Sequence, residues 1–135
     1  FIEAVETIMG NCAVTAPVYE TEAEAMHGFT LAMTCDNKFY RPISEKDTQE
    51  GYADIFLCPL VDNFSDMLHS YIVELKYAKS KDTDAHVEQL RQDAIRQVVR
   101  YAESEVVTSA IKTTQLHKII VVYKGTEMVV CEEVE

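Results

Sequence analysis

The sequence predicts an α/β domain in which a central mixed sheet of about five strands is flanked by helices. The apolar positions alternate between helical spacing and short runs, in the order helix, three strands, long helix, two strands. Three successive strands favour antiparallel neighbours, and a long helix after the third can act as a crossover to a parallel fourth. With 135 residues and 47% hydrophobic content, the chain is long enough to form one domain with its own core.

Two helices are expected before the first strand. Residues 1–9 carry apolar side chains on one helical face. Thr21 is a suitable N-cap, and Glu24 follows it at the spacing of a capping box, which predicts a helix that runs to about Met33.

Three strands follow. Residues 38–44 form the first, after the turn signal Asp36–Asn37, and residues 53–57 form a more buried second strand that Pro59 ends. A polar loop leads to the third strand at 69–77.

The second half of the chain is expected to hold the long helix and two more strands. Residues 84–103 have apolar positions at helical spacing. After a polar linker, strands are expected at 118–123 and 127–131, with a turn at 124–126. The last five residues, CEEVE, are expected to be a frayed acidic tail.

Composition restricts the class of protein. The net charge of −11 argues against broad nonspecific attraction to nucleic acid, which clustered Lys and Arg would provide. The four cysteines lie far apart in the sequence, which favours reduced thiols in a cytoplasmic protein over disulfides or a zinc site. No apolar run is long enough for a membrane helix, and the missing initiator Met suggests a domain cut from a longer chain.

The third strand carries a charged pair inside an apolar stretch. In YIVELKY, Glu74 and Lys76 share one face of the strand, while Leu75 points to the other face. If the second and third strands pair, Asp54 of GYADIFL can lie near Glu74. Two close carboxylates repel unless a cation or proton lies between them, and oxygen ligands of this kind suit Mg²⁺.

A second interpretation of these charged residues gives them no catalytic or metal-binding role. A Glu-x-Lys pair on a strand is usually a solvated face with a weak ion pair, and an Asp near a strand start is usually a turn residue. The ordered combination of Asp54 and then Glu74 with Lys76 shifts the balance towards a site for metal-assisted phosphodiester hydrolysis.

The order of these motifs resembles the PD-(D/E)XK nuclease superfamily. GYADIFL, YIVELKY, QVVRYA late in the long helix and the strands KIIVVYKG and EMVVCEEVE carry the resemblance, which runs from about residue 20 to 135. They look like the nuclease-like C-terminal domain that follows an AAA-ATPase-like domain in many bacterial proteins. The resemblance implies that 1–135 is one nuclease-like domain with a restriction-endonuclease-like core, at the C-terminal end of a longer cytoplasmic chain with an ATPase-like domain before it.

The resemblance also implies roles for particular residues. Asp54 and Glu74 would bind Mg²⁺, or Mn²⁺ in its place, with the backbone carbonyl of Leu75, and Lys76 would be the catalytic lysine. Glu24 in the first core helix, with Glu22 as its alternate, and Gln97 in the long helix would complete the catalytic set. Ala53 stands where the motif that gives the family its name has Pro.

The expected activity is Mg²⁺-dependent cleavage of nucleic acid, with DNA as the expected partner and no membrane association. The alternative is an inactive or weakly active nuclease fold that serves as a binding or regulatory module for the ATPase-like domain. The acidic charge favours this alternative.

Other polar residues have two interpretations each. His27 could hold a phosphate or simply pack, and the three remaining histidines are scattered without metal-like spacing. Lys79 and Lys81 could meet phosphates or only add solubility. Arginines recur along the long helix at 91, 96 and 100, either as a DNA-facing stripe or as partners of nearby acidic residues.

Overall fold

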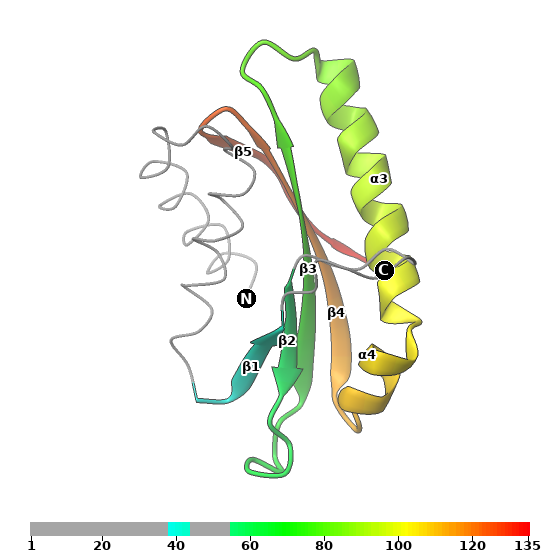
Figure 1. Ribbon diagram of the computed structural model, residues 1–135. Helices are drawn as coiled ribbons and strands as arrows, with labels where there is room; N and C mark the ends of the chain where they lie inside the picture. Colours follow the sequence, from blue (N-terminus) through cyan, green and yellow to red (C-terminus); the bar gives the residue numbers. More distant parts are fainter. Residues whose placement is uncertain (1–37, 44–54) are drawn as a thin grey trace.

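The computed structural model describes residues 38–43 and 55–135, so both expected N-terminal helices lie outside the described residues. Within them, one sheet has its strands in chain order (Figure 1). The strands are β1 (Tyr40–Ile43), β2 (Ile55–Pro59), β3 (His69–Ala78), β4 (Gln115–Lys124) and β5 (Glu127–Val134). The α/β class and the mixed sheet are confirmed.

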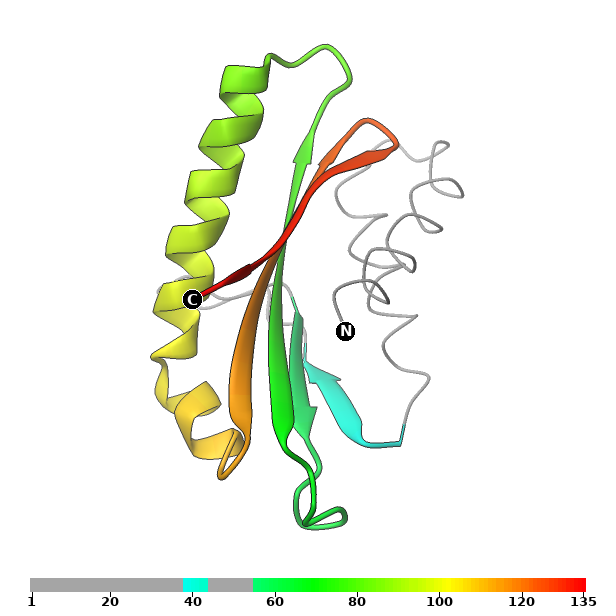
Figure 2. The same ribbon diagram turned by 180° about the vertical axis from the view of Figure 1, so that it is seen from behind.

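The pairing directions follow the expectation. β1 with β2, β2 with β3, and β4 with β5 are antiparallel, whereas β3 and β4 are parallel. A parallel pair needs a crossover, and α3 (Asp84–Ala102) and α4 (Glu105–Ala110) supply it. Both helices lie on the same face of the sheet (Figures 1 and 2).

Helix α3 begins where the sequence predicts. The Thr83 side chain accepts a hydrogen bond from the His86 backbone N–H at 3.2 Å, which caps the first turn. The buried residues of α3 are Ala94, Val98 and Tyr101, which recur at helical spacing and face the sheet. None of the helices among the described residues is long and apolar enough to cross a membrane.

The polar linker expected after α3 is wrong, because it contains α4. Ser104 caps this helix by accepting a hydrogen bond from the Val107 N–H at 3.4 Å. Val107 is fully buried, whereas Val106 is 49% exposed. With one buried residue in six, α4 shows too little periodicity to be found from the sequence.

The frayed tail expected at the C-terminus is also wrong. β5 continues to Val134, which pairs with Lys118 of β4, and Ile119 pairs with Glu133. Arg91 of α3 contacts Glu132 at 2.6 Å, which ties this strand to the helix. The acidic residues led to the prediction of a frayed tail, but the backbone pairing that forms a strand does not depend on side-chain polarity.

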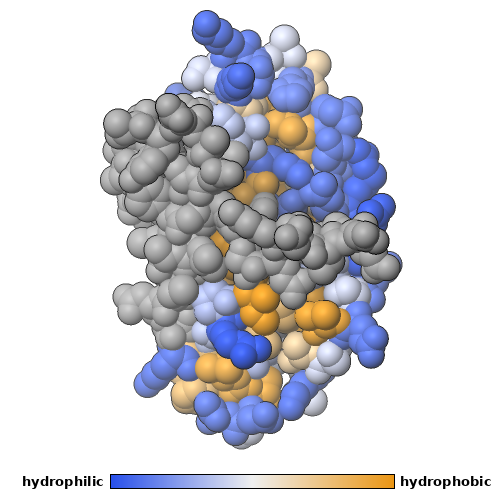
Figure 3. Space-filling model, viewed as in Figure 1, coloured by the Kyte–Doolittle hydropathy of each residue, from blue (hydrophilic) through white to orange (hydrophobic). Residues whose placement is uncertain are grey.

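The sheet separates two apolar layers. On the face covered by the helices, Phe56, Ile72 and Ile120 pack with the buried residues of α3 and α4. On the other face, Ile55, Val73 and Ile119 form a second cluster. The outer side of α3 is mostly hydrophilic, while hydrophobic residues gather at the lower end of the molecule (Figure 3).

Candidate active site

Strand β3 sets the directions of the candidate residues. Its alternation places Val73 and Leu75 in the apolar cluster on the face without the described helices. Glu74 and Lys76 therefore point to the opposite face, which α3 covers. The prediction that the charged pair shares one face, with Leu75 on the other, is confirmed.

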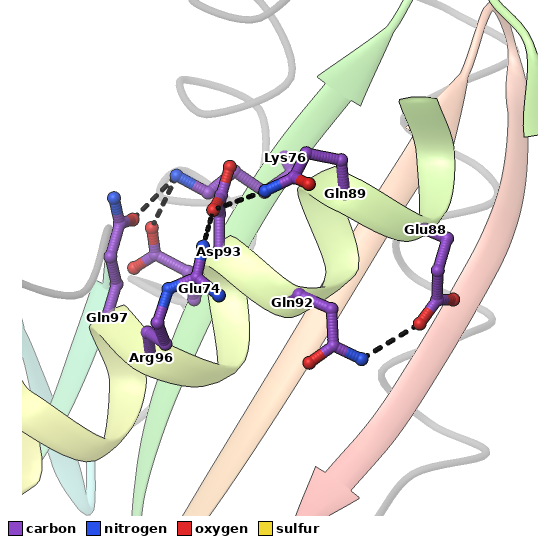
Figure 4. A network of polar contacts seen from close by, with 8 residues as sticks. All are labelled: Glu74, Lys76, Glu88, Gln89, Gln92, Asp93, Arg96 and Gln97. Atoms are coloured by element: carbon purple, nitrogen blue, oxygen red, sulfur yellow. Dashed lines mark hydrogen bonds and ion pairs between the residues drawn. The ribbon is translucent and has the colours of Figure 1, made fainter. Parts of the chain in front are cut away.

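Glu74, Lys76 and Gln97 converge between β3 and α3 (Figure 4). The Lys76 ammonium lies 3.3 Å from Glu74 Oε1 and donates a hydrogen bond to Gln97 Oε1 at 2.6 Å. Glu74 is only 2% exposed, so the interpretation of a solvated surface pair is wrong for this carboxylate. Helix α3 removes the carboxylate from water by covering this face of β3.

The ammonium group of Lys76 has a donor left for a further partner. An ammonium has three N–H donors, and its two polar contacts in the described part of the chain are those to Glu74 and Gln97. The Lys76 side chain is 20% exposed, so a substrate atom can reach it. The site thus combines a desolvated carboxylate with a fixed cationic donor that remains accessible.

Two of the three arginines of α3, Arg91 and Arg96, pair with acidic residues of the same helix. Arg96 forms an ion pair with Asp93, which also accepts a hydrogen bond from Gln89 at 3.2 Å (Figure 4). Arg91 contacts Glu88 at 3.1 Å in addition to its contact with β5. For Arg91 and Arg96, the structure favours the interpretation as partners of acidic residues over a DNA-facing stripe.

Three of the expected site residues cannot be placed. Asp54, Glu24 and its alternate Glu22 lie outside the described residues. β2 begins at Ile55, which pairs with Val73. In the sequence, Asp54 comes just before Ile55, and Glu74 comes just after Val73. Paired antiparallel strands run in opposite directions, so this order is the one that the expected proximity of the two carboxylates requires.

One described residue has a side-chain donor of the type that Mg²⁺ prefers. Glu74 provides a buried carboxylate, which is the hard oxygen ligand that Mg²⁺ prefers, and Mg²⁺ commonly takes only one or two carboxylates from a protein. No group of three or more His, Cys, Asp or Glu residues suited to a metal occurs in the described ranges. The donor type therefore fits the ion, and the second expected carboxylate belongs to Asp54.

The structure brings together two histidines that the sequence interpretation called scattered. His117 Nε2 lies 2.9 Å from His69 Nδ1, and His117 Nδ1 lies 2.5 Å from Glu133 Oε1. The Tyr71 ring stacks on His117, and partial burial, with the charges of Tyr40 and Glu133, raises the pKa of Tyr71. Only the parallel register of β3 and β4 places His69 near His117, so no local spacing could have revealed the contact.

Two of the four cysteines lie among the described residues. Cys58 and Cys131 are free thiols. Cys12 and Cys35 lie outside the described residues.

The mixed sheet, its crossover helices and the buried pair on β3 define an α/β domain of the restriction-endonuclease-like class. A family model described as the PD-(D/E)XK nuclease superfamily matches residues 20–133. The chain belongs to the PD-(D/E)XK nuclease superfamily. No curated protein and no solved structure matches the chain.

Proposed function

We propose that this domain is a Mg²⁺-dependent nuclease that hydrolyses phosphodiester bonds of nucleic acid, with DNA as the substrate. The observation that carries the proposal is the buried Glu74 carboxylate beside Lys76, on a central strand of a nuclease-superfamily chain. Even a paired carboxylate loses more hydration on burial than its ion pair commonly recovers, so the burial of Glu74 is weak evidence for a stabilising role and supports a role in chemistry.

Lys76 is the residue that acts on the reacting atoms in this proposal. Its remaining N–H donates a hydrogen bond to the attacking water or to a phosphate oxygen on which negative charge develops. Gln97 Oε1 accepts a hydrogen bond from the same ammonium at 2.6 Å and thereby fixes the orientation of the Lys76 ammonium group. Preorganised donors of this kind stabilise charge in the transition state without further rearrangement.

Glu74 and Asp54 are the proposed metal ligands, together with the backbone carbonyl of Leu75, and Mn²⁺ replaces Mg²⁺ at the same ligands. When bound, the ion supplies Lewis-acid activation of the phosphate and of water. Glu24, or Glu22 in its place, adds a carboxylate from the N-terminal part of the chain. These assignments rest on the family motif and on the placement of Glu74.

The cellular setting belongs to the same proposal. Residues 1–135 act as one nuclease-like domain at the C-terminal end of a longer cytoplasmic chain, after an ATPase-like domain. The resemblance of the motifs to bacterial proteins of that organisation supports this setting.

A second candidate function is a nuclease fold that serves as a binding or regulatory module. The observations that favour it are the net charge of −11 and the pairing of Arg91 and Arg96 with acidic residues. Pairing lowers the positive potential that α3 can offer to phosphates. This function predicts protein binding without metal-dependent cleavage.

A metal titration tests the first candidate. Addition of Mg²⁺ or Mn²⁺ should raise the melting temperature of the wild-type domain, because a ligand that binds only the folded state stabilises it. A site with a Kd of about 1 mM gains about 1.4 kcal/mol in the free energy of unfolding at about 10 mM metal. Asp54→Ala and Glu74→Ala should both lose this response.

The matched control is Asp66→Ala, which removes one carboxylate from an exposed loop position. It should keep the full metal response. Cleavage of DNA in Mg²⁺ should then be lost in Lys76→Met and retained in the control. Wild-type cleavage by Lys76→Met would overturn the assignment, and the absence of any metal response in the wild type would favour the binding module.

A further inference from the structure

A pocket of about 290 Å³ lies apart from the Glu74–Lys76 pair. Residues 58–61 and Ala110 line it, together with four polar residues, Arg41, Asp62, Asn63 and Lys112. It joins β1, the end of β2, the turn after β2 and the segment that follows α4.

The strand register places this pocket on the same face of the sheet as the candidate active site. Arg41 pairs with Cys58, and Phe56 pairs with Ile72. Directly paired residues share a face and alternate residues along a strand share a face. Arg41 therefore lies on the face of Ile72 and Glu74, which is the face that the helices cover.

The pocket lining carries positive charge that acidic side chains neutralise only in part. Arg41 is exposed, and within the part of the chain that the structure describes its side chain makes no hydrogen bond or ion pair. Lys112 lies 3.1 Å from Asp62, but both side chains are exposed, at 50% and 88%, so water screens the pair. A guanidinium and an ammonium beside one small pocket form an environment that attracts a phosphate group.

The backbone at Lys112 is a second, independent observation. Its φ is +50°, in the left-handed region that Gly or Asn usually occupies after a helix. A lysine in this position carries a conformational cost that glycine would avoid. Strained positions of this kind cluster at ligand sites, where the side chain has a use.

We propose that this pocket binds a phosphate group of the same nucleic-acid strand that is cut at the Glu74–Lys76 site. This inference rests on the proposed function. From Glu74, Arg41 lies four residues along the sheet, or about 13 Å at ~3.3 Å per residue, and two strands across it, or about 10 Å at ~4.8 Å per strand. The two components combine to about 16 Å, which one strand of duplex DNA, with a rise of about 3.4 Å per nucleotide, spans in about five steps.

Salt-dependent binding tests the role of Arg41. The probe is fluorescently labelled single-stranded DNA of about 12 nucleotides, and chelator prevents cleavage during the measurement. Arg41→Gln should weaken binding about 5- to 10-fold at low salt and reduce the slope of log K against log salt by about 0.7, the value for one phosphate contact. Lys38→Gln is the control, since this exposed lysine lies over the Phe39 ring and does not line the pocket.

The acidic residue of the pocket gives a test of opposite sign. Asp62→Asn frees Lys112 and should strengthen DNA binding, whereas Asp66→Asn makes the same change of charge in the same turn region outside the pocket lining. The proposal is overturned if Arg41→Gln matches Lys38→Gln and Asp62→Asn matches Asp66→Asn.

Lys112→Gly separates binding from folding. Glycine relieves the left-handed backbone, so the melting temperature should be no lower than that of the wild type, while DNA binding should weaken. A variant that binds DNA as the wild type does would contradict a role for the Lys112 ammonium.

Two further experiments identify the source of the phosphate and test this inference independently of the proposed function. Glu74→Gln should lose cleavage while its Arg41-dependent DNA binding in chelator remains, so either claim can fail alone. If the wild type binds adenosine monophosphate through Arg41 but does not bind DNA, assignment of the pocket to a nucleic-acid strand is wrong. If it binds neither DNA, adenosine monophosphate nor inorganic phosphate, the phosphate pocket itself is wrong.

Discussion

Glu74 and Lys76 are removed from water to different extents. The Glu74 side chain is 3% exposed and that of Lys76 is 20% exposed, although their charged atoms are 3.3 Å apart. Burial of a carboxylate costs several kcal/mol of hydration, which an ion pair recovers only in part. The pair therefore places the larger desolvation cost on the residue that the proposal makes a metal ligand.

This difference in exposure predicts that two substitutions change the free energy of unfolding differently in the absence of metal. Lys76→Met leaves the Glu74 charge without its ammonium and should lower the free energy of unfolding by about 1–3 kcal/mol. Glu74→Gln removes the buried charge and should leave the free energy of unfolding unchanged within about 0.5 kcal/mol, or raise it. Urea denaturation measures both.

Lys79→Met is the matched control for Lys76→Met, since Lys79 follows the same strand and is exposed. It should change the free energy of unfolding by no more than about 0.5 kcal/mol. Equal effects at positions 76 and 79 would show that Glu74 does not depend on its lysine.

Part of the site could be predicted from local sequence. Strand alternation was enough to place Glu74 and Lys76 on one face and Leu75 on the other. The contact between Lys76 and Gln97 depends on how α3 packs over β3, which no local pattern contains. The contact between His69 and His117, 48 residues apart, depends on the parallel register and was missed for the same reason.

At the scale of secondary structure elements, the strong patterns were predicted and the weak ones were not. α3 spans Asp84–Ala102 and matches the predicted helix within one residue at its end, because a repeated apolar face marks it. α4 has a cap but a single buried side chain, and β5 has acidic residues in its second half. Tertiary packing rather than local pattern determines both of these elements.

The contribution of α4 to the free energy of unfolding can be measured by substitutions at two adjacent positions of the helix. Val107 is fully buried against the helix-covered face, so Val107→Ala should lower the free energy of unfolding by about 1.5–3 kcal/mol. Val106→Ala truncates a half-exposed neighbour on the same helix and should cost less than about 1 kcal/mol. Equal losses in chemical denaturation would mean that α4 does not pack as described.

For the whole molecule, the parallel pair of β3 and β4 is the central feature. Five consecutive residues of β4, from Ile119 to Tyr123, are buried, and both apolar layers draw on this strand. Helices α3 and α4 lie between β3 and β4 in the chain, so the core depends on contacts between residues far apart in the sequence. Contacts of this kind slow folding relative to local ones.

The C-terminal strand β5 has one neighbour in the described sheet, β4. An edge strand offers unpaired backbone groups to other molecules, and charged side chains are a common protection against this. β5 carries Glu127, Glu132 and Glu133 around the exposed Val129. Glu132 pairs with Arg91 and Glu133 with His117, so of the three it is the exposed Glu127 whose charge most directly opposes the addition of another copy's strand to this edge.

Self-association should therefore depend on electrostatic repulsion along this edge. At about 1 M salt the Debye length falls to about 3 Å, and light scattering by the concentrated protein should increase with time. Val129→Lys places a charge on the strand at an exposed position and should slow the increase at moderate salt, whereas Val106→Lys, on α4, should not. If the two variants aggregate alike, β5 is not the surface through which the molecules associate, and colloidal stability has another origin.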